Sequence, residues 1–101
     1  MIAQTILQQI GGRRFTVMTG SKNFIDMGKG LRMNLSRNQT QANRLEITLD
    51  ESTDTYTMRF YKQSITKHFE VKIKEIVEYD MVYCDMLEEI FKSTTGLDTR
   101  L

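Results

Sequence analysis

The residues between positions 11 and 24 include types that could bind a phosphate group. The stretch reads GGRRFTVMTGSKNF and combines glycines, arginines and Lys22. A phosphate-binding P-loop requires a glycine five residues before a Gly-Lys pair, and Ser or Thr after the lysine. Ahead of Gly28-Lys29 that position holds Asn23, and Gly30 follows the lysine. The P-loop is therefore rejected, and the cations of this stretch are expected to form a contact surface.

The chain has one histidine, His68, and one cysteine, Cys84. Zinc coordination would need carboxylates to complete the ligand set, and nucleophilic catalysis would need the two residues to meet across the fold. We expect His68 on the polar face of a strand. We expect Cys84 to pack within a helix, next to an acid that does not activate a thiol. The sequence therefore predicts a non-enzyme with no catalytic residue, no metal site and no cofactor.

Three carboxylates near the C-terminus, Asp85, Glu88 and Glu89, could do acid–base or metal chemistry. A solvated acidic helix face explains them more simply, and as a surface they are a candidate protein interface. Arg59 and Tyr61 form a second candidate interface. Tyr61 falls on the polar side of its strand, and Tyr and Arg are enriched where interfaces carry binding energy.

Cations are concentrated in the first half of the chain. Residues 1–44 carry seven Lys and Arg against one Asp, whereas residues 45–101 carry seven against twelve acids, within a net charge of +1. Clustered cations bind phosphates, and an exposed aromatic ring can stack on bases. The candidate nucleic-acid contacts are Arg13, Arg14, Lys22, Phe24, Lys29 and Arg32. The alternative, solvated cations at strand ends, is supported by a pI near 7.8, which is low for a nucleic-acid-binding domain.

Hydrophobic periodicity predicts a helix, four or five antiparallel strands and a second helix. Isoleucines at positions 2, 6 and 10 recur at helical spacing, and Gly11-Gly12 would end this helix. Alternation predicts strands over residues 14–19, 31–35, 44–49, 56–61 and 69–74, with a loop over residues 20–30. Asp80 would cap the last helix, whose apolar positions run from Tyr83 to Phe91 and which Gly96 would end.

These elements predict a single α+β domain over residues 1–101, in which both helices cover one face of the sheet. Its apolar side chains offset the ordering entropy only marginally, which leaves room for a homodimer. No run approaches the roughly 20 apolar residues of a membrane helix. The single cysteine excludes an internal disulfide and suits a reducing compartment. We therefore expect a cytoplasmic protein with no membrane contact.

The stretches GGRRFTVMTGSKNF, RLEITLDESTDTYTMRFYK, VYCDMLEEIF and TGLDTRL resemble a group of small phage and prophage proteins of unknown function. The resemblance implies a virus-encoded gene that acts in a bacterial host cell, and it implies no catalytic residue. Small phage domains of this kind often occupy a surface of a host machine, as inhibitors of bacterial immune nucleases (anti-CRISPR proteins) do.

The resemblance therefore leads us to expect a non-catalytic binding protein that blocks or modulates a host protein or protein–nucleic-acid complex. The alternative is a small nucleic-acid-binding accessory protein of a phage or mobile element that uses the basic N-terminal half of the chain.

Overall fold

A five-stranded antiparallel sheet forms the centre of the computed structural model, which describes residues 2–97. The strands are β1 (Lys22–Asp26), β2 (Gly30–Asn34), β3 (Arg44–Asp50), β4 (Thr55–Ile65) and β5 (Val71–Val82). Each strand pairs with the next one along the chain, so the sheet order is the sequence order. This arrangement confirms the α+β class and the antiparallel sheet expected from the sequence.

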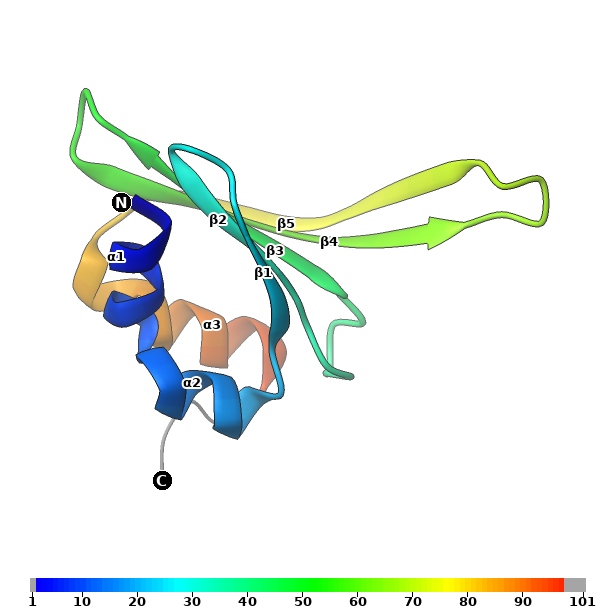
Figure 1. The fold of residues 1–101 in the computed structure, drawn as a ribbon, viewed down its shortest axis with the longest axis horizontal. Coiled ribbons are helices and arrows are strands. Elements are labelled where there is room, and N and C mark those ends of the chain that lie inside the picture. Colours follow the sequence, from blue (N-terminus) through cyan, green and yellow to red (C-terminus); the bar gives the residue numbers. More distant parts are fainter. Residues whose placement is uncertain (1, 98–101) are drawn as a thin grey trace.

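The helices lie together on one face of the sheet, as the sequence predicts (Figure 1). They are α1 (Ile2–Ile10), α2 (Gly12–Thr19), the short 3-10 helix η1 (Cys84–Met86) and α3 (Leu87–Thr95). None of the helices in the described residues has the length and apolar character needed to cross a bilayer.

The core forms between these helices and the apolar face of the sheet. The rings of Phe15 in α2 and Phe91 in α3 meet edge to face, with their centres 4.8 Å apart. Ile6 and Ile10 of α1 are fully buried against the same cluster. The sheet contributes every second residue, as alternation predicts, and these are Leu31, Met33, Leu45, Ile47, Tyr56, Met58 and Phe60. The other side of each strand therefore forms the outer face of the sheet.

The predicted strand over residues 14–19 is wrong, because this segment is the helix α2. The predicted end of the first helix at Gly11-Gly12 is confirmed, since α1 ends at Ile10 and the two glycines have φ angles of 132° and 59°; a second helix begins at this break. The buried residues of α2 are Phe15 and Thr19, four positions apart, whereas Val17 is 71% exposed. Helical spacing therefore explains the burial of this segment, and the two-residue alternation does not.

The predicted loop over residues 20–30 contains the strand β1, which is mostly exposed and so shows no alternation. Gly20 ends α2 in the left-handed conformation, with φ of 71° and its N–H donated to Thr16 O at 3.0 Å. Phe24 is the residue of β1 that packs against the core.

The predicted fifth strand is longer than expected, and the last helix begins later. Asp80 lies within β5 and caps no helix, because β5 continues to Val82, which is buried opposite Tyr56. Extra residues in β5 shift its register twice, and Met81 has a φ of 55° at the second shift. These bulges hide the strand from an alternation test. The predicted end at Gly96 is confirmed, since its N–H bonds to Lys92 O at 2.8 Å and its φ is 77°.

Residues 62–74, here called the arm, form a two-stranded ribbon that projects from the body of the molecule (Figure 1). Strand β3 pairs with β4 only as far as Arg44 and Tyr61. Beyond that point β4 pairs with β5 alone, from Lys62 and Lys74 to Ile65 and Val71. Neither face of the arm is therefore covered by the helices or by a third strand.

Candidate functional site

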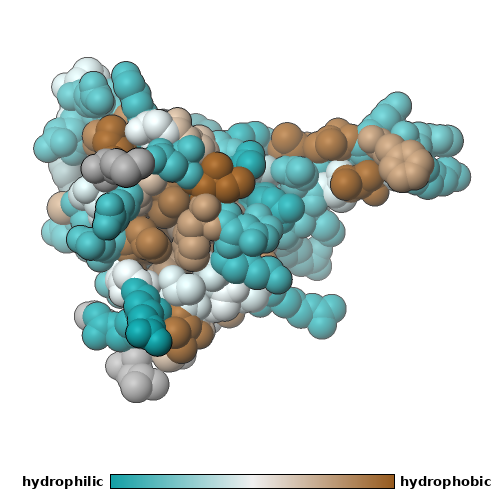
Figure 2. Space-filling model, in the orientation of Figure 1, coloured by the Kyte–Doolittle hydropathy of each residue, from teal (hydrophilic) through white to brown (hydrophobic). Residues whose placement is uncertain are grey.

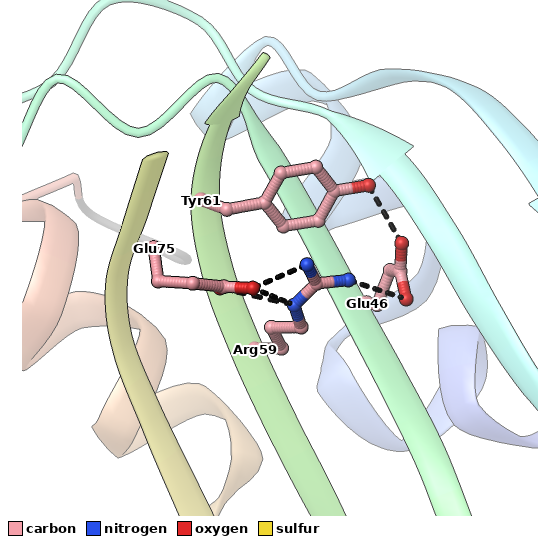
Figure 3. Close-up of polar contacts among 4 residues, drawn as sticks. All are labelled: Glu46, Arg59, Tyr61 and Glu75. Atoms are coloured by element: carbon pink, nitrogen blue, oxygen red, sulfur yellow. Dashed lines mark hydrogen bonds and ion pairs between the residues drawn. The ribbon is translucent and has the colours of Figure 1, made fainter. Parts of the chain in front are cut away.

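Four side chains form a polar network on the outer face of the sheet, where β3, β4 and β5 lie side by side (Figure 3). The hydroxyl of Tyr61 donates to Glu46 Oε2 at 2.6 Å. The guanidinium of Arg59 donates from Nε to both oxygens of Glu75, at 2.8 and 3.0 Å. The same guanidinium lies 3.5 Å from Glu46 Oε1 and 4.4 Å from the ring centre of Tyr61. Arg59 of β4 thus links a carboxylate on β3 to a carboxylate on β5, the strands on either side of it.

The network shifts the proton affinity of its members. Burial of Tyr61, and then its bond to the Glu46 carboxylate, raises the pKa of the phenol above its usual value. The hydrogen bond from Arg59 lowers the pKa of Glu75. Arg59 and Tyr61 meet on the polar face, as the sequence predicts, but Tyr61 is only 2% exposed. The ring of Tyr61 is therefore covered and does not present itself to a partner.

The predicted acidic surface lies at the beginning of the last helix. Asp85 belongs to η1, and Glu88 and Glu89 form the first turn of α3. Carboxylates in this position interact favourably with the positive end of the helix dipole. Asp85 and Glu89 are exposed and Glu88 is half-buried. Their position explains these three acids by helix stability alone.

The residues considered for nucleophilic chemistry lie far apart. His68 occupies the turn at the tip of the arm instead of a strand, and Cys84 begins η1 at the other end of the molecule (Figure 1). The expected burial of Cys84 is wrong, because its side chain is exposed while Leu87 and Phe91 enter the core. Within the described residues, no group of three or more His, Cys, Asp or Glu could hold a metal ion.

The structure disperses the six predicted nucleic-acid contacts. Arg13 and Arg14 lie exposed at the beginning of α2, and Lys22 begins β1. Lys29 lies at the opposite end of the β1–β2 hairpin, 4.0 Å from Glu51.

The other two predicted contacts also lack the expected setting. Arg32 is half-buried on the outer face, paired in register with Glu46. Phe24 packs against the core, so its ring is not free to stack on a base.

One face of the arm carries an apolar strip that no other part of the described chain covers. Ile65 lies opposite Val71, and Ile73 follows two residues later on the same side. These three side chains are 52–67% exposed, and Phe69 at the tip is 88% exposed. Figure 2 shows the apolar colour continuing along the projecting arm. We call Ile65, Phe69, Val71 and Ile73 the apolar strip.

The opposite face of the arm carries three lysines, Lys62, Lys72 and Lys74, which we call the lysine face. Lys62 lies directly opposite Lys74, and Ser64 lies opposite Lys72. All three lysines are exposed, and none forms an ion pair with any residue of the described chain. Lys62 also lines a hollow of about 530 Å³ at the base of the arm, together with Arg37 and the rest of the loop between β2 and β3.

The predicted strand over residues 69–74 covers one side of the arm, but the projecting ribbon and its two exposed faces were not predicted. Val71 and Ile73 alternate with Lys72 and Lys74, which predicts a strand with one apolar and one basic face. The net negative charge of residues 45–101 masks this local concentration of lysines. A local count of charge on each face of the strand would have found them.

Comparison with known proteins finds no match to this chain among protein-family models, curated proteins or solved structures.

Proposed function

We propose that the chain is a non-catalytic binding protein that occupies a protein surface of a host machine through the apolar strip of its arm. The exposed strip is the observation that carries this proposal. Contiguous exposed apolar patches on soluble proteins mark interaction sites, because water is an unfavourable neighbour for such surface. The resemblance to phage proteins supports a bacterial host as the source of the partner.

The tip of the arm is organised to present Phe69. The hydroxyl of Thr66 accepts the N–H groups of His68 and Glu70, at 3.3 and 3.2 Å. The Thr66 carbonyl accepts the N–H of Phe69 at 2.9 Å, and the Thr66 N–H donates to Glu70 O at 2.9 Å. These four hydrogen bonds stabilise the turn. An ordered aromatic anchor loses less conformational entropy on binding than a mobile one.

The backbone of Phe69 supports the same proposal. Its φ angle is 63°, a left-handed conformation that is unfavourable for a bulky side chain. Packing does not account for this conformation, because the ring of Phe69 is not part of the core. Residues held in sparsely populated backbone conformations cluster at active sites, ligand clamps and switch regions.

The acidic residues of the last helix have a structural explanation, and the exposed apolar strip has none. Asp85, Glu88 and Glu89 lie where carboxylates stabilise a helix N-terminus, whereas the apolar strip contributes nothing to the buried core of the described residues. We therefore assign partner docking to the arm and treat the acidic helix as the comparison surface.

The test is capture of a partner from a bacterial lysate, with and without nuclease, followed by measurement of its affinity. The double variant Phe69→Ser/Ile73→Ser is expected to weaken binding of the identified partner by at least about 30-fold, the effect of losing one hot-spot residue. A variant with Asp85, Glu88 and Glu89 reversed to lysine is the control and is expected to keep the affinity. Undiminished binding by the arm variant, with a folded circular dichroism spectrum, would contradict the proposal.

A further inference from the structure

We propose that the lysine face of the arm is a binding site for the phosphate backbone of duplex DNA. The site consists of Lys62, Lys72 and Lys74, on the side of the arm opposite the apolar strip. This inference does not depend on docking of the apolar strip, because different side chains carry each contact.

The pairing of Lys62 with Lys74 is the first observation. The two residues are directly opposite in the antiparallel register, where side chains lie about 4.5–5.5 Å apart at Cβ. Like charges in this position destabilise a sheet. Lys72 lies one pair further toward the tip, on the same face. Stability of the fold does not favour this arrangement, whereas a bound polyanion relieves the repulsion.

The outer face of the same sheet gives the contrast. There Arg32, Glu46 and Arg59 alternate in charge across three neighbouring strands, and Arg59 bonds to Glu75 on the fourth. On the outer face each of these cations therefore lies opposite a carboxylate, whereas Lys62 lies opposite another lysine. Glu70 is the acidic residue nearest in sequence to Lys72, and it lies at the tip of the arm, beyond the paired lysines.

The shape of the arm favours duplex DNA over other polyanions. A two-stranded β-ribbon fits the major groove of B-DNA, which is about 12 Å wide, while the major groove of A-form RNA is too narrow. Lys72 and Lys74 lie about 6.8 Å apart along their strand, far enough to reach separate phosphates. The lysine face carries no aromatic side chain on which the bases of a single strand could stack.

The base of the arm extends the cationic surface toward the body. Arg37 and Lys62 line the same hollow, whose remaining wall is formed mainly by polar residues of the loop between β2 and β3. Arg37 is exposed and has no ion pair within the described chain. A duplex that lies along the lysine face thus meets a further cation where the arm joins the sheet.

The test measures binding of the full chain to a fluorescent 20-base-pair DNA duplex of mixed sequence, by anisotropy over a range of salt concentrations. Each phosphate contact contributes about −0.9 to the slope of log affinity against log salt. Three contacts therefore predict a loss of affinity of about 40-fold between 50 and 200 mM salt. The variant Lys62→Gln/Lys72→Gln/Lys74→Gln is expected to bind more weakly and to lose about 2.7 from the magnitude of this slope.

The matched control is Arg13→Gln/Arg14→Gln/Lys22→Gln, which removes the same charge from the N-terminal cations. It is expected to keep most of the slope. Equal weakening by the two triple variants, or unchanged binding by the lysine variant, overturns the assignment. So does the absence of duplex binding at 50 mM salt, or tighter binding of a single strand of equal length.

The variant Phe69→Ser/Ile73→Ser separates this inference from docking of the apolar strip. It is expected to keep its affinity for the duplex while it loses the protein partner. Loss of duplex binding by this variant, with the arm still folded, would show that the lysine face does not act by itself.

Discussion

Gly30 is buried at the beginning of β2 and has no room for a side chain. A Cβ atom placed there would lie 2.4 Å from Ile47 O and 3.0 Å from Thr48 Cα, both in the backbone of β3. Since neither atom belongs to a flexible side chain, Gly30→Ala must push two paired strands apart. We expect the free energy of unfolding to fall by about 1–3 kcal/mol, as measured by urea denaturation.

The control for this prediction is Thr48→Ala, at the exposed position paired with Gly30. It creates no clash and is expected to change stability by less than about 0.5 kcal/mol. An unchanged urea midpoint for Gly30→Ala would mean that β2 and β3 do not approach as closely as described.

Ionisation of Tyr61 is expected to lower the free energy of unfolding at alkaline pH. Its burial and its bond to Glu46 raise its pKa above the usual value of 10.0, so the folded state favours the neutral phenol. This contribution is fully present below pH 10 and is lost as the pH rises through the folded value. We expect stability to fall above about pH 10, and to fall less steeply in Tyr61→Phe, which has no phenol to ionise.

The measurement for Tyr61 is urea denaturation at several values between about pH 9 and 11.5. Tyr83→Phe is the control, because its side chain is exposed. Identical slopes for Tyr61→Phe and the unmodified protein would remove Tyr61 from the explanation. Tyr56, whose pKa burial also raises, would then be the next candidate.

At the scale of elements, alternation predicts β2, β3 and the first half of β4 because one face of each packs against helices. Leu31 and Met33, or Leu45 and Ile47, are buried, while Arg32 and Glu46 between them face outward. One buried face is the condition under which a period of two appears in a sequence. The same alternation correctly predicts that Arg59 and Tyr61 lie side by side on the outer face.

The elements that the sequence did not predict lack this condition. In α2, the edge-to-face contact between Phe15 and Phe91 selects helical spacing, and that contact depends on α3, far along the chain. In β5, the first bulge moves Val77 and Tyr79 out of step with Ile73, and the second shifts the register again before Val82, so no single alternation spans the strand. The polar run from Lys62 to Ser64 resembles a loop until β5 is known to pair with it.

At the scale of the whole molecule, the arm and the body have separate parts in the structure. The core includes no residue between 62 and 75, so the arm adds nothing to the buried cluster. An isolated two-stranded ribbon is at best marginally stable in water, and the body supports this one at its base only. The exposed strip, the strained Phe69 and the opposed lysines all lie on this ribbon. These three features are unfavourable for stability, and all of them lie on the arm, outside the core that holds the body together.

This separation predicts that the arm can be removed without loss of the fold. Tyr61 and Glu75 face each other in the register, so an Asn-Gly turn can join them in place of residues 62–74. We expect the shortened chain to keep its circular dichroism spectrum and a thermal midpoint within about 5 °C, because no core contact is lost. The same chain should bind neither the duplex nor the captured partner. A shortened chain that fails to fold would make the arm structural, and one that still binds both ligands would move both sites to the body.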